Sequence, residues 1–207
     1  LAARHGMSGI AECLGLGERG LVAIAGAGGK TTIAWRIAAD LAAAGRRVAV
    51  TTTTRMRAGE EPEGTPVIRW AGIDRTAGEA AAAVAAGRVP LVIGGTDDKG
   101  KNLGVGPGEA CDLAERLDWL VVEADGSRGL PFKIPREGEP VVPEAATHLL
   151  VVVGLAAIGR PASPETVFGH GAMLAAGLIE PEEILDAAAA RRLILGPAGY
   201  LPHVREG

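Results

Sequence analysis

Short apolar runs alternate with helical patterns along the chain. The runs cover residues 21–25, 47–53, 65–70, 90–95, 119–126 and 148–154, of which 65–70 is the weakest. The runs "WLVVEADG" and "HLLVVVG" are nearly continuous, as is typical of strands buried on both faces of a parallel sheet. Parallel strands need crossover connections, so the alternation predicts an α/β fold: a mostly parallel sheet with helices on both faces.

Four segments carry helical patterns. They span residues 30–44, 76–87, 108–117 and 180–192. The second is expected to begin with a capping box of Thr76 and Glu79, and the last with Pro181 at its first position. The segment 126–147 contains four prolines and no predicted regular structure. Loops of that length in compact domains are usually functional.

Composition excludes several classes of partner. A net charge of −4 and an aromatic content of 3% argue against a surface for nucleic acid or anionic membrane. The chain has no apolar run of about 18 residues, and its first twenty residues have no signal-peptide core. Its two cysteines are distant and lack metal-ligand spacing. We therefore expect a cytoplasmic protein that binds neither nucleic acid nor membrane.

The stretch "AGAGGKTT", residues 25–32, joins the first apolar run to the first helical pattern. Its glycines allow positive φ angles, so that backbone N–H groups and the helix dipole face an anion. Lys30 would reach the β- and γ-phosphates of a nucleotide, and Thr31 would give its hydroxyl to Mg²⁺. The residues expected to hold the nucleotide here are Gly26, Ala27, Gly28, Gly29, Lys30, Thr31 and Thr32. The alternative is a tight turn with a solvated lysine. The eight-residue phosphate-binding pattern would also have glycine at Ile24.

Polar residues follow two further strands, at the edge where parallel sheets bind ligands. Thr53 and Thr54 lie beyond the run 47–53 or at its end, and they are candidates to contact Mg²⁺, a water or the γ-phosphate. Glu123 directly follows four apolar residues. In many nucleotide-binding proteins the acidic residue that holds Mg²⁺ follows an apolar strand in the same way. Asp125 is the second metal candidate, or else a turn residue before Gly126.

Further charged residues lie outside these strand ends. Arg128 and Lys133 could neutralise a transferring phosphate or be solvated surface charges. The catalytic candidates are Lys30, Asp125 and Lys133. The hydrophilic segment from Asp97 to Lys101 is typical of a lid or a second substrate loop. His170 stands alone, and a lone histidine is more often structural than catalytic.

Four stretches together resemble the YqeC-type accessory proteins of selenium-dependent molybdenum hydroxylases. They are "AGAGGKTT", "VAVTTTTRM", "LVVEADGSRGLPFKIPREGEPVVP" and "VVVGLAAIGRP". The resemblance implies a P-loop fold that binds ATP or GTP. It also implies a role in maturing a selenium-containing cofactor, with a molybdenum hydroxylase or a cofactor intermediate as partner. The family's glycine loop has the GxGGKTT form, so Ile24 is no departure.

The resemblance also implies a difference at the chain's end. Family members continue into a strand with an Asn-Lys-x-Asp-like ending that could select the base, whereas this chain stops at Gly207. We therefore expect residues 1–207 to form a single P-loop α/β domain that lacks its C-terminal strand, as a fragment of a longer protein. The choice between ATP and GTP stays open.

Three functions fit these residues. The leading one is an Mg²⁺-dependent NTPase that acts as a maturation factor. The second is an ATP-dependent small-molecule kinase, in which Asp125 and Lys133 could serve acceptor phosphorylation, or a Mur-like amide ligase. The third is a module that binds nucleotide without turnover, since no residue stands out as the group that positions the attacking water.

Overall fold

A six-stranded parallel sheet forms the centre of the computed structural model, which describes residues 9–204. Its strand order is β10-β1-β8-β2-β5-β4, and every neighbouring pair is parallel. The strands are β1 (Gly20–Gly26), β2 (Val48–Thr52), β4 (Val67–Arg69), β5 (Leu91–Ile93), β8 (Trp119–Glu123) and β10 (His148–Val152). The predicted parallel α/β fold is confirmed. Residues 1–8, on which part of the signal-peptide prediction rests, and Gly207 lie outside the described residues.

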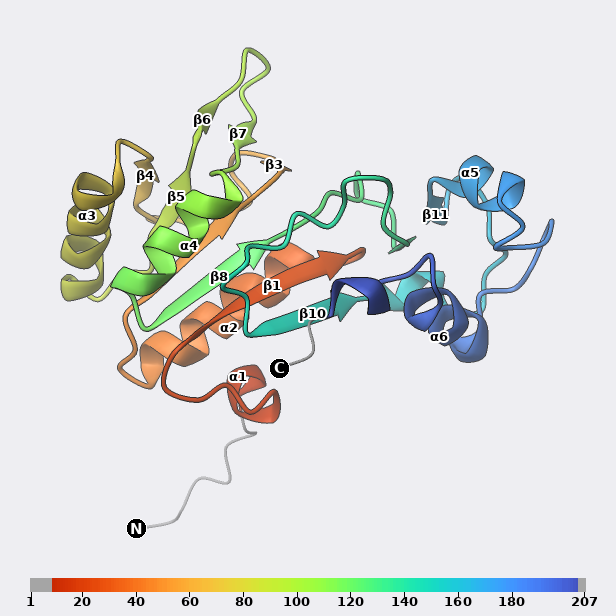
Figure 1. The fold of residues 1–207 in the computed structure, drawn as a ribbon, viewed down its shortest axis with the longest axis horizontal. Coiled ribbons are helices and arrows are strands. Elements are labelled where there is room, and N and C mark those ends of the chain that lie inside the picture. The colour runs from red at the N-terminus through yellow and green to blue at the C-terminus, as the bar shows by residue number, and fades with distance from the viewer. Residues whose placement is uncertain (1–8, 205–207) are drawn as a thin grey trace, which may run out of the picture.

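Helices cover both faces of this sheet, as predicted (Figure 1). Alternate side chains of β1 point to opposite faces of the sheet and pack against different helices. Ile24 packs with α1 (Ile10–Cys13) and α2 (Lys30–Ala43) on one face. Ala23 packs with α3 (Ile73–Ala85) and α4 (Pro107–Arg116) on the other. β1 is therefore buried on both sides, which holds its carboxyl end in a rigid frame.

A small antiparallel sheet projects beyond the carboxyl ends of β2 and β5 (Figure 1). It consists of β3 (Arg55–Met56), β7 (Asn102–Leu103) and β6 (Gly95–Thr96), in that order. The predicted strand 90–95 is therefore split between β5 and β6. The segment from Asp97 to Lys101 forms the projecting tip, where the Asp97 carboxylate accepts the backbone N–H groups of Lys99 and Lys101.

The C-terminal lobe comprises residues 155–200 together with β9 (Phe132–Lys133). β9 pairs in parallel with β11 (Val167–Phe168). The other elements of the lobe are η1 (Leu155–Ala157), α5 (His170–Ala175) and α6 (Ala187–Leu195), and η2 (Leu201–His203) follows it toward the start of β10. A hydrophobic cluster of its own holds the lobe together, and β1 and β10 point toward it (Figure 1). Apart from β9, the predicted irregular segment 126–147 has no strand or helix among its described residues.

Two predicted helix starts are wrong. α3 begins at Ile73 after Gly72, so Thr76 lies inside the helix and Glu79 pairs with Arg75 rather than completing a capping box. The last helix begins only after Asp186, whose carboxylate accepts the Ala189 N–H at 2.7 Å.

The predicted start at Pro181 fails because the backbone there is not helical. Glu182 has a positive φ of 59°, and Ile184 forms a bridge with Pro161 instead. The capping aspartate Asp186 is the local signal that would have placed the start of α6 correctly.

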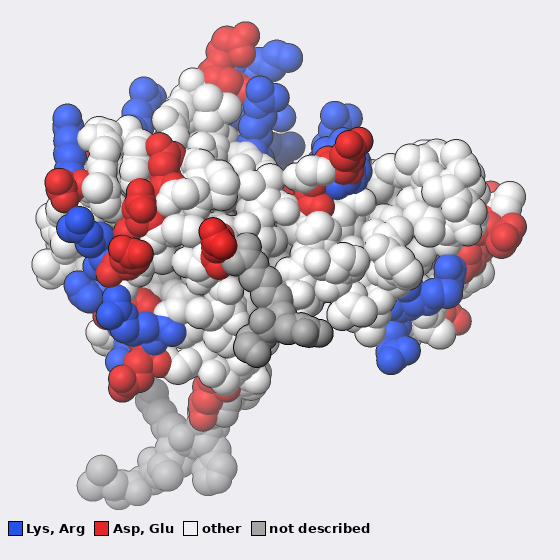
Figure 2. Space-filling view, viewed as in Figure 1, with Lys and Arg blue, Asp and Glu red and all other residues white. Residues whose placement is uncertain are grey.

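The surface carries both signs of charge. Figure 2 shows Lys and Arg side chains interspersed with Asp and Glu over the sheet region on this face, with neither sign dominant. None of the helices in the part of the chain that the structure describes is long and apolar enough to cross a membrane.

Candidate functional site

The carboxyl ends of β1, β8 and β2 bring the predicted site together. Glu123 is the register partner of Ile24 on one side and of Thr52 on the other. Each strand continues directly into the loop that carries its candidate residues. Glu123 therefore lies between the threonine run and the glycine loop, defined here as residues 26–29.

The glycine loop has the predicted left-handed backbone. Gly26, Gly28 and Gly29 have φ angles of 97°, 75° and 105°. A Cβ atom on Gly28 would lie 2.5 Å from the Cα of Gly154, and one on Gly26 would lie 2.2 Å from the Val152 carbonyl oxygen. The first two glycines are thus required by close backbone packing as well as by conformation. Around Gly29 the position of a Cβ is open.

The N-terminus of α2 opens directly onto this loop. Gly29 is its N-cap, and no described side chain caps the helix. The first N–H groups of a helix have no partner within it, so those of the first turn are available to an anion. Two other N–H groups of the loop are already used. Ala27 donates to the Val152 carbonyl at 2.8 Å, and Gly26 donates to the Asp125 carboxylate at 3.0 Å.

Lys30 folds back beneath the glycine loop and is only 5% exposed. Its Nζ donates to the Gly26 carbonyl at 2.9 Å. It also lies 3.3 Å from Oδ1 of Asp125 and 3.9 Å from Oε1 of Glu123. The ammonium group is therefore held by two carboxylates, close to the start of α2.

Thr31 and Glu123 form a pair of oxygen donors in the first turn of α2. The Thr31 hydroxyl donates to Oε2 of Glu123 at 3.0 Å. Burial raises the pKa of Glu123, although the charge of Lys30 and the Thr31 hydrogen bond oppose that rise. A hydroxyl beside a carboxylate suits a hard cation such as Mg²⁺. The described residues contain no group of three or more His, Cys, Asp or Glu side chains that could hold a metal.

The threonine run is tied to neighbouring backbone. The Thr52 hydroxyl and the Thr53 N–H both bond to the Glu123 carbonyl, at 2.9 and 3.1 Å. The Thr53 hydroxyl donates to the Val141 carbonyl at 2.7 Å. The Thr54 hydroxyl lies 3.3 Å from that of Thr52. These bonds bring the run against Glu123, and a ligand role for Thr53 or Thr54 stays a prediction.

Asp125 is completely buried at the centre of an ionic network. Its Oδ2 accepts hydrogen bonds from the Gly26 N–H and the Tyr200 hydroxyl, at 3.0 and 3.1 Å. The same oxygen lies 3.2 Å from Nζ of Lys133. Oδ1 has no well-directed hydrogen bond in the described structure and faces Lys30 at 3.3 Å. Protein groups therefore contact both oxygens of the carboxylate. A metal role for Asp125 stays a prediction.

Lys133 is buried beside Asp125 with all of its donors engaged. Its ammonium donates to the Gly126 carbonyl and to Glu139, each at 2.8 Å, in addition to its contact with Asp125. Burial opposes ionisation of Glu139, but hydrogen bonds from Arg136 and Lys133 outweigh it and lower its pKa to about 2. Lys133 thus anchors the segment 126–139 beneath the glycine loop, and a direct catalytic role stays a prediction.

Tyr200 is the site residue that sequence reasoning missed. It comes from the C-terminal lobe, is 1% exposed, and donates to a carboxylate 75 residues away in the chain. Burial and the Asp125 charge raise the pKa of its hydroxyl, so the hydroxyl stays protonated as a donor. Its being the one tyrosine of the chain was the only signal in the sequence.

Other predicted residues lie away from the glycine loop. The tip from Asp97 to Lys101 belongs to the projecting sheet, with Asp97 paired to Arg55 at 3.8 Å. His170 begins α5 in the C-terminal lobe. Arg128 is exposed and lies over the Phe168 ring, 5.5 Å from its centroid.

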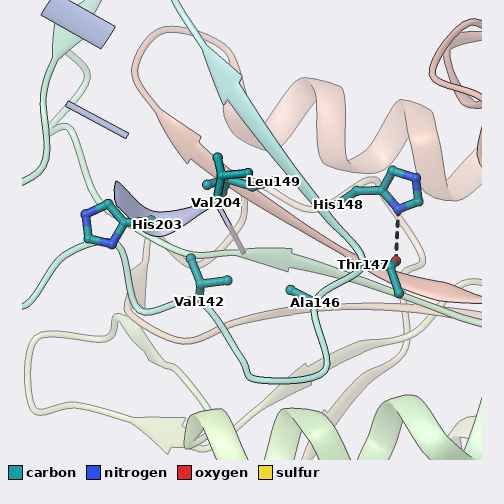
Figure 3. A pocket seen from close by; sticks show the side chains of 7 residues that line it. All are labelled: Val142, Ala146, Thr147, His148, Leu149, His203 and Val204. Carbon is teal, nitrogen blue, oxygen red and sulfur yellow. Dashed lines mark hydrogen bonds between the residues drawn. The ribbon is translucent and has the colours of Figure 1, made fainter. Parts of the chain in front are cut away.

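A cavity of about 80 Å³ lies at the opposite end of β10 (Figure 3). His148 and Leu149 line it from the start of β10, and His203 and Val204 line it from the end of the described chain. Val152, at the other end of β10, is the residue that meets the glycine loop. The cavity is therefore separate from the site at the carboxyl ends of the strands.

Comparison with known proteins agrees with the motif resemblance. The model of the family described as YqeC protein matches residues 22–170, a range that contains every predicted site residue but not Tyr200. The chain is 31% identical over 193 residues to uncharacterized protein YqeC of Escherichia coli (strain K12). That alignment covers 90% of this chain and 72% of the relative. No solved structure matches the chain. The chain belongs to the YqeC family.

Proposed function

We propose that the chain binds an Mg²⁺-nucleoside triphosphate, ATP or GTP, at the glycine loop and hydrolyses it. In this role it acts as an accessory factor in maturation of a selenium-dependent molybdenum hydroxylase or its cofactor. The observation that carries the nucleotide site is the uncapped N-terminus of α2, beside buried Lys30 and the Thr31–Glu123 pair. Membership of the YqeC family supports an accessory role in general, and the selenium and molybdenum assignment rests on the motif resemblance.

The residues present fit a phosphate chain and its magnesium ion. The free N–H groups at the start of α2 would bind the phosphate oxygens. Thr31 and Glu123 would hold Mg²⁺ directly or through water, and phosphate and water oxygens would complete its octahedral shell. The ion would supply neutralisation of charge on the phosphates. Because Mg²⁺ usually keeps several waters, two protein donors are sufficient.

Lys30 could exchange a carboxylate contact for a phosphate contact when nucleotide binds. Its ammonium is shared between Asp125 and Glu123, and a phosphate at the helix N-terminus would add a third acceptor. If Lys30 turned to the phosphate, Asp125 would keep its contacts with Lys133 and Tyr200. The network can therefore release Lys30 without leaving Asp125 unpaired, which would be costly for a buried carboxylate.

The direct test is stabilisation of the protein by nucleotide. Millimolar ATP or GTP with Mg²⁺ is expected to raise the melting temperature, whereas adenosine or guanosine without phosphates is not. Ligand at 100 times its Kd stabilises by about 2.7 kcal/mol. For a chain of this size that corresponds to a rise of roughly 5–10 °C. No rise with either triphosphate would contradict the proposal at its first step.

Phosphate release separates the proposed NTPase from the other two functions. Release of inorganic phosphate from ATP or GTP by the protein alone supports hydrolysis. Release only after addition of a small-molecule acceptor would instead support a kinase or ligase. A rise in melting temperature with nucleotide but without any phosphate release would support a module that binds nucleotide without turnover.

The raised pKa of Glu123 predicts that magnesium-dependent binding weakens on acidification. Glu123 takes up its proton at a higher pH than an ordinary glutamate, because burial disfavours its charge. A protonated carboxyl group cannot hold Mg²⁺, so the affinity for Mg²⁺-nucleotide should fall as the pH is lowered through that pKa. Isothermal titration calorimetry across the pH range measures this dependence.

Glu123→Gln should remove this pH dependence and weaken the effect of Mg²⁺. The exposed Glu115→Gln on α4 is the matched control and should leave the pH profile unchanged.

The raised pKa of Glu123 also sets how the stability of the free protein changes with pH. A carboxyl group with a raised pKa in the folded state makes the free protein less stable as the pH rises toward that pKa. Bound Mg²⁺ should reduce this loss. An unchanged pH profile in Glu123→Gln would show that this carboxylate does not hold the ion.

A further inference from the structure

A second cavity, of about 150 Å³, lies in the C-terminal lobe. It lies between the segment that follows β9 and the helix α5. Ile134, Met173 and Leu178 provide an apolar lining, while Phe168, Ala172 and Arg136 also face it. Arg136 and Ala172 are exposed, so a ligand can enter from solvent. We call this space the Phe168 cavity.

Three cationic groups surround the Phe168 ring. The Arg136 guanidinium lies 4.7 Å from the ring centroid, Lys133 Nζ 5.4 Å and the Arg128 guanidinium 5.5 Å. Such cations are attracted to the face of an aromatic ring. Three positive charges on one ring also repel one another, so the arrangement favours a negative charge nearby.

The acids of the protein neutralise only part of this charge. Lys133 is satisfied by Asp125 and Glu139, and Arg136 shares Glu139. Arg128 has no ion pair among the described residues and is exposed. The Arg136 guanidinium donates two hydrogen bonds to Glu139, at 2.8 and 3.2 Å, yet 54% of its side chain is exposed. Arg128 is therefore open to an anion at the Phe168 ring, and the exposed part of the Arg136 guanidinium adds donors that Glu139 does not cover.

We propose that the Phe168 cavity binds a small anion with a planar or apolar body. Arg136 lines the cavity, and Arg128 lies over the Phe168 ring without being a lining residue. Both would bind the carboxylate or phosphate, since planar guanidinium groups match both anions. The body would lie against Phe168 and Met173. An apolar protein cavity of about 150 Å³ can bind benzene, so this volume suits a single small ring.

The cavity is linked to the glycine loop by a short chain of contacts. Lys133 reaches from the Phe168 ring to Asp125, and Asp125 holds both the Gly26 N–H and Lys30. An anion bound at the ring would attract the Lys133 ammonium group. This attraction would weaken the contact between Lys133 and Asp125. Ligand at the cavity and nucleotide at the loop should therefore change each other's affinity. This coupling rests on the proposed nucleotide site, whereas the cavity itself does not.

Methionine methyl groups report on the cavity directly. The chain has three methionines, of which Met173 lines the cavity and Met56 lies buried in a different hydrophobic cluster. In protein labelled with ¹³C at the methionine methyl groups, titration with phenylphosphonate should shift the Met173 signal in a saturable manner. The Met56 signal should stay in place. Benzoate tests a carboxylate in the same way, and benzyl alcohol tests the neutral body. No saturable shift with either anion, or equal binding of benzyl alcohol, overturns the proposal.

Variants separate binding at the cavity from a general loss of structure. Arg136→Gln and Arg128→Gln should each weaken phenylphosphonate binding at least tenfold, while the exposed Arg191→Gln on α6 should leave it unchanged. Arg136→Gln also removes a hydrogen-bond partner of Glu139. Ala172→Phe therefore provides a second test, in which no charged residue is changed. Its ring should fill the cavity mouth and abolish the Met173 shift. Unchanged binding in both Arg136→Gln and Ala172→Phe overturns the proposed site.

The two proposals fail in distinguishable ways. If Mg²⁺-nucleotide gives no thermal stabilisation but phenylphosphonate still shifts Met173, the nucleotide site fails and the cavity stands. If both ligands bind and neither changes the other's Kd by twofold or more, the coupling is overturned. A change of twofold or more in both directions supports it.

Discussion

Replacing Lys30 by alanine is expected to remove about half or more of the rise in melting temperature that Mg²⁺-nucleotide produces. Lys30 is the first residue of α2, where the free N–H groups lie, and its side chain is buried. Hydrogen bonds to charged groups contribute about 1.5–3 kcal/mol. Its loss should thus lower nucleotide affinity by roughly 10- to 100-fold. Thermal shift and isothermal titration calorimetry measure both effects.

Lys30→Ala also removes a partner of two buried carboxylates, so a second variant must test the loop without changing a charge. Gly28→Ala does so, because its Cβ atom would lie 2.5 Å from the Gly154 Cα. It should weaken nucleotide binding at least tenfold. Gly45→Ala is the matched control: its φ of 78° resembles the 75° of Gly28, but nothing lies within 4 Å of its Cβ position. It should cost about 1 kcal/mol of stability and leave binding intact. Normal binding in both Lys30→Ala and Gly28→Ala would exclude the loop as the nucleotide site.

Replacing Lys133 by methionine is expected to lower the free energy of unfolding by about 3–5 kcal/mol. The side chain is completely buried, and its ammonium contacts Asp125, Glu139 and the Gly126 carbonyl. Methionine fills similar space but leaves the two carboxylates without this cation. The melting temperature should fall by roughly 10 °C. Urea unfolding followed by circular dichroism gives the free energy.

Two comparison variants separate the buried charge from a general effect of losing a lysine. Lys101→Met, at the exposed tip of the antiparallel sheet, should change stability by less than about 0.5 kcal/mol. Tyr200→Phe removes one hydrogen bond to Asp125 and should cost an intermediate amount, about 1.5–3 kcal/mol. A Lys133→Met protein as stable as the Lys101→Met protein would show that the network contributes little to folding.

Helix boundaries show where local sequence patterns are sufficient. α2 begins at Lys30 as predicted, since the preceding glycines stop the strand and the apolar period starts at once. α3 and α6 begin elsewhere than predicted: α3 begins after Gly72, which has no capping side chain, and α6 begins after Asp186, whose carboxylate caps it.

The sequence by itself determined the parallel sheet, the left-handed glycine loop and the placement of Glu123 beside it. These features depend on strand-length apolar runs, on glycine's access to positive φ, and on the shared carboxyl edge of neighbouring parallel strands. Each is set within a few residues or by the period of the strands.

Only the tertiary structure decided that Asp125 and Lys133 are buried partners, and that Tyr200 joins them. The three residues come from β8's following loop, β9 and the segment before η2. A charged group in a sequence pattern is equally compatible with solvent and with burial. Which of the two occurs depends on whether distant segments bring compensating donors to the same point, here the Tyr200 hydroxyl and the Gly26 N–H.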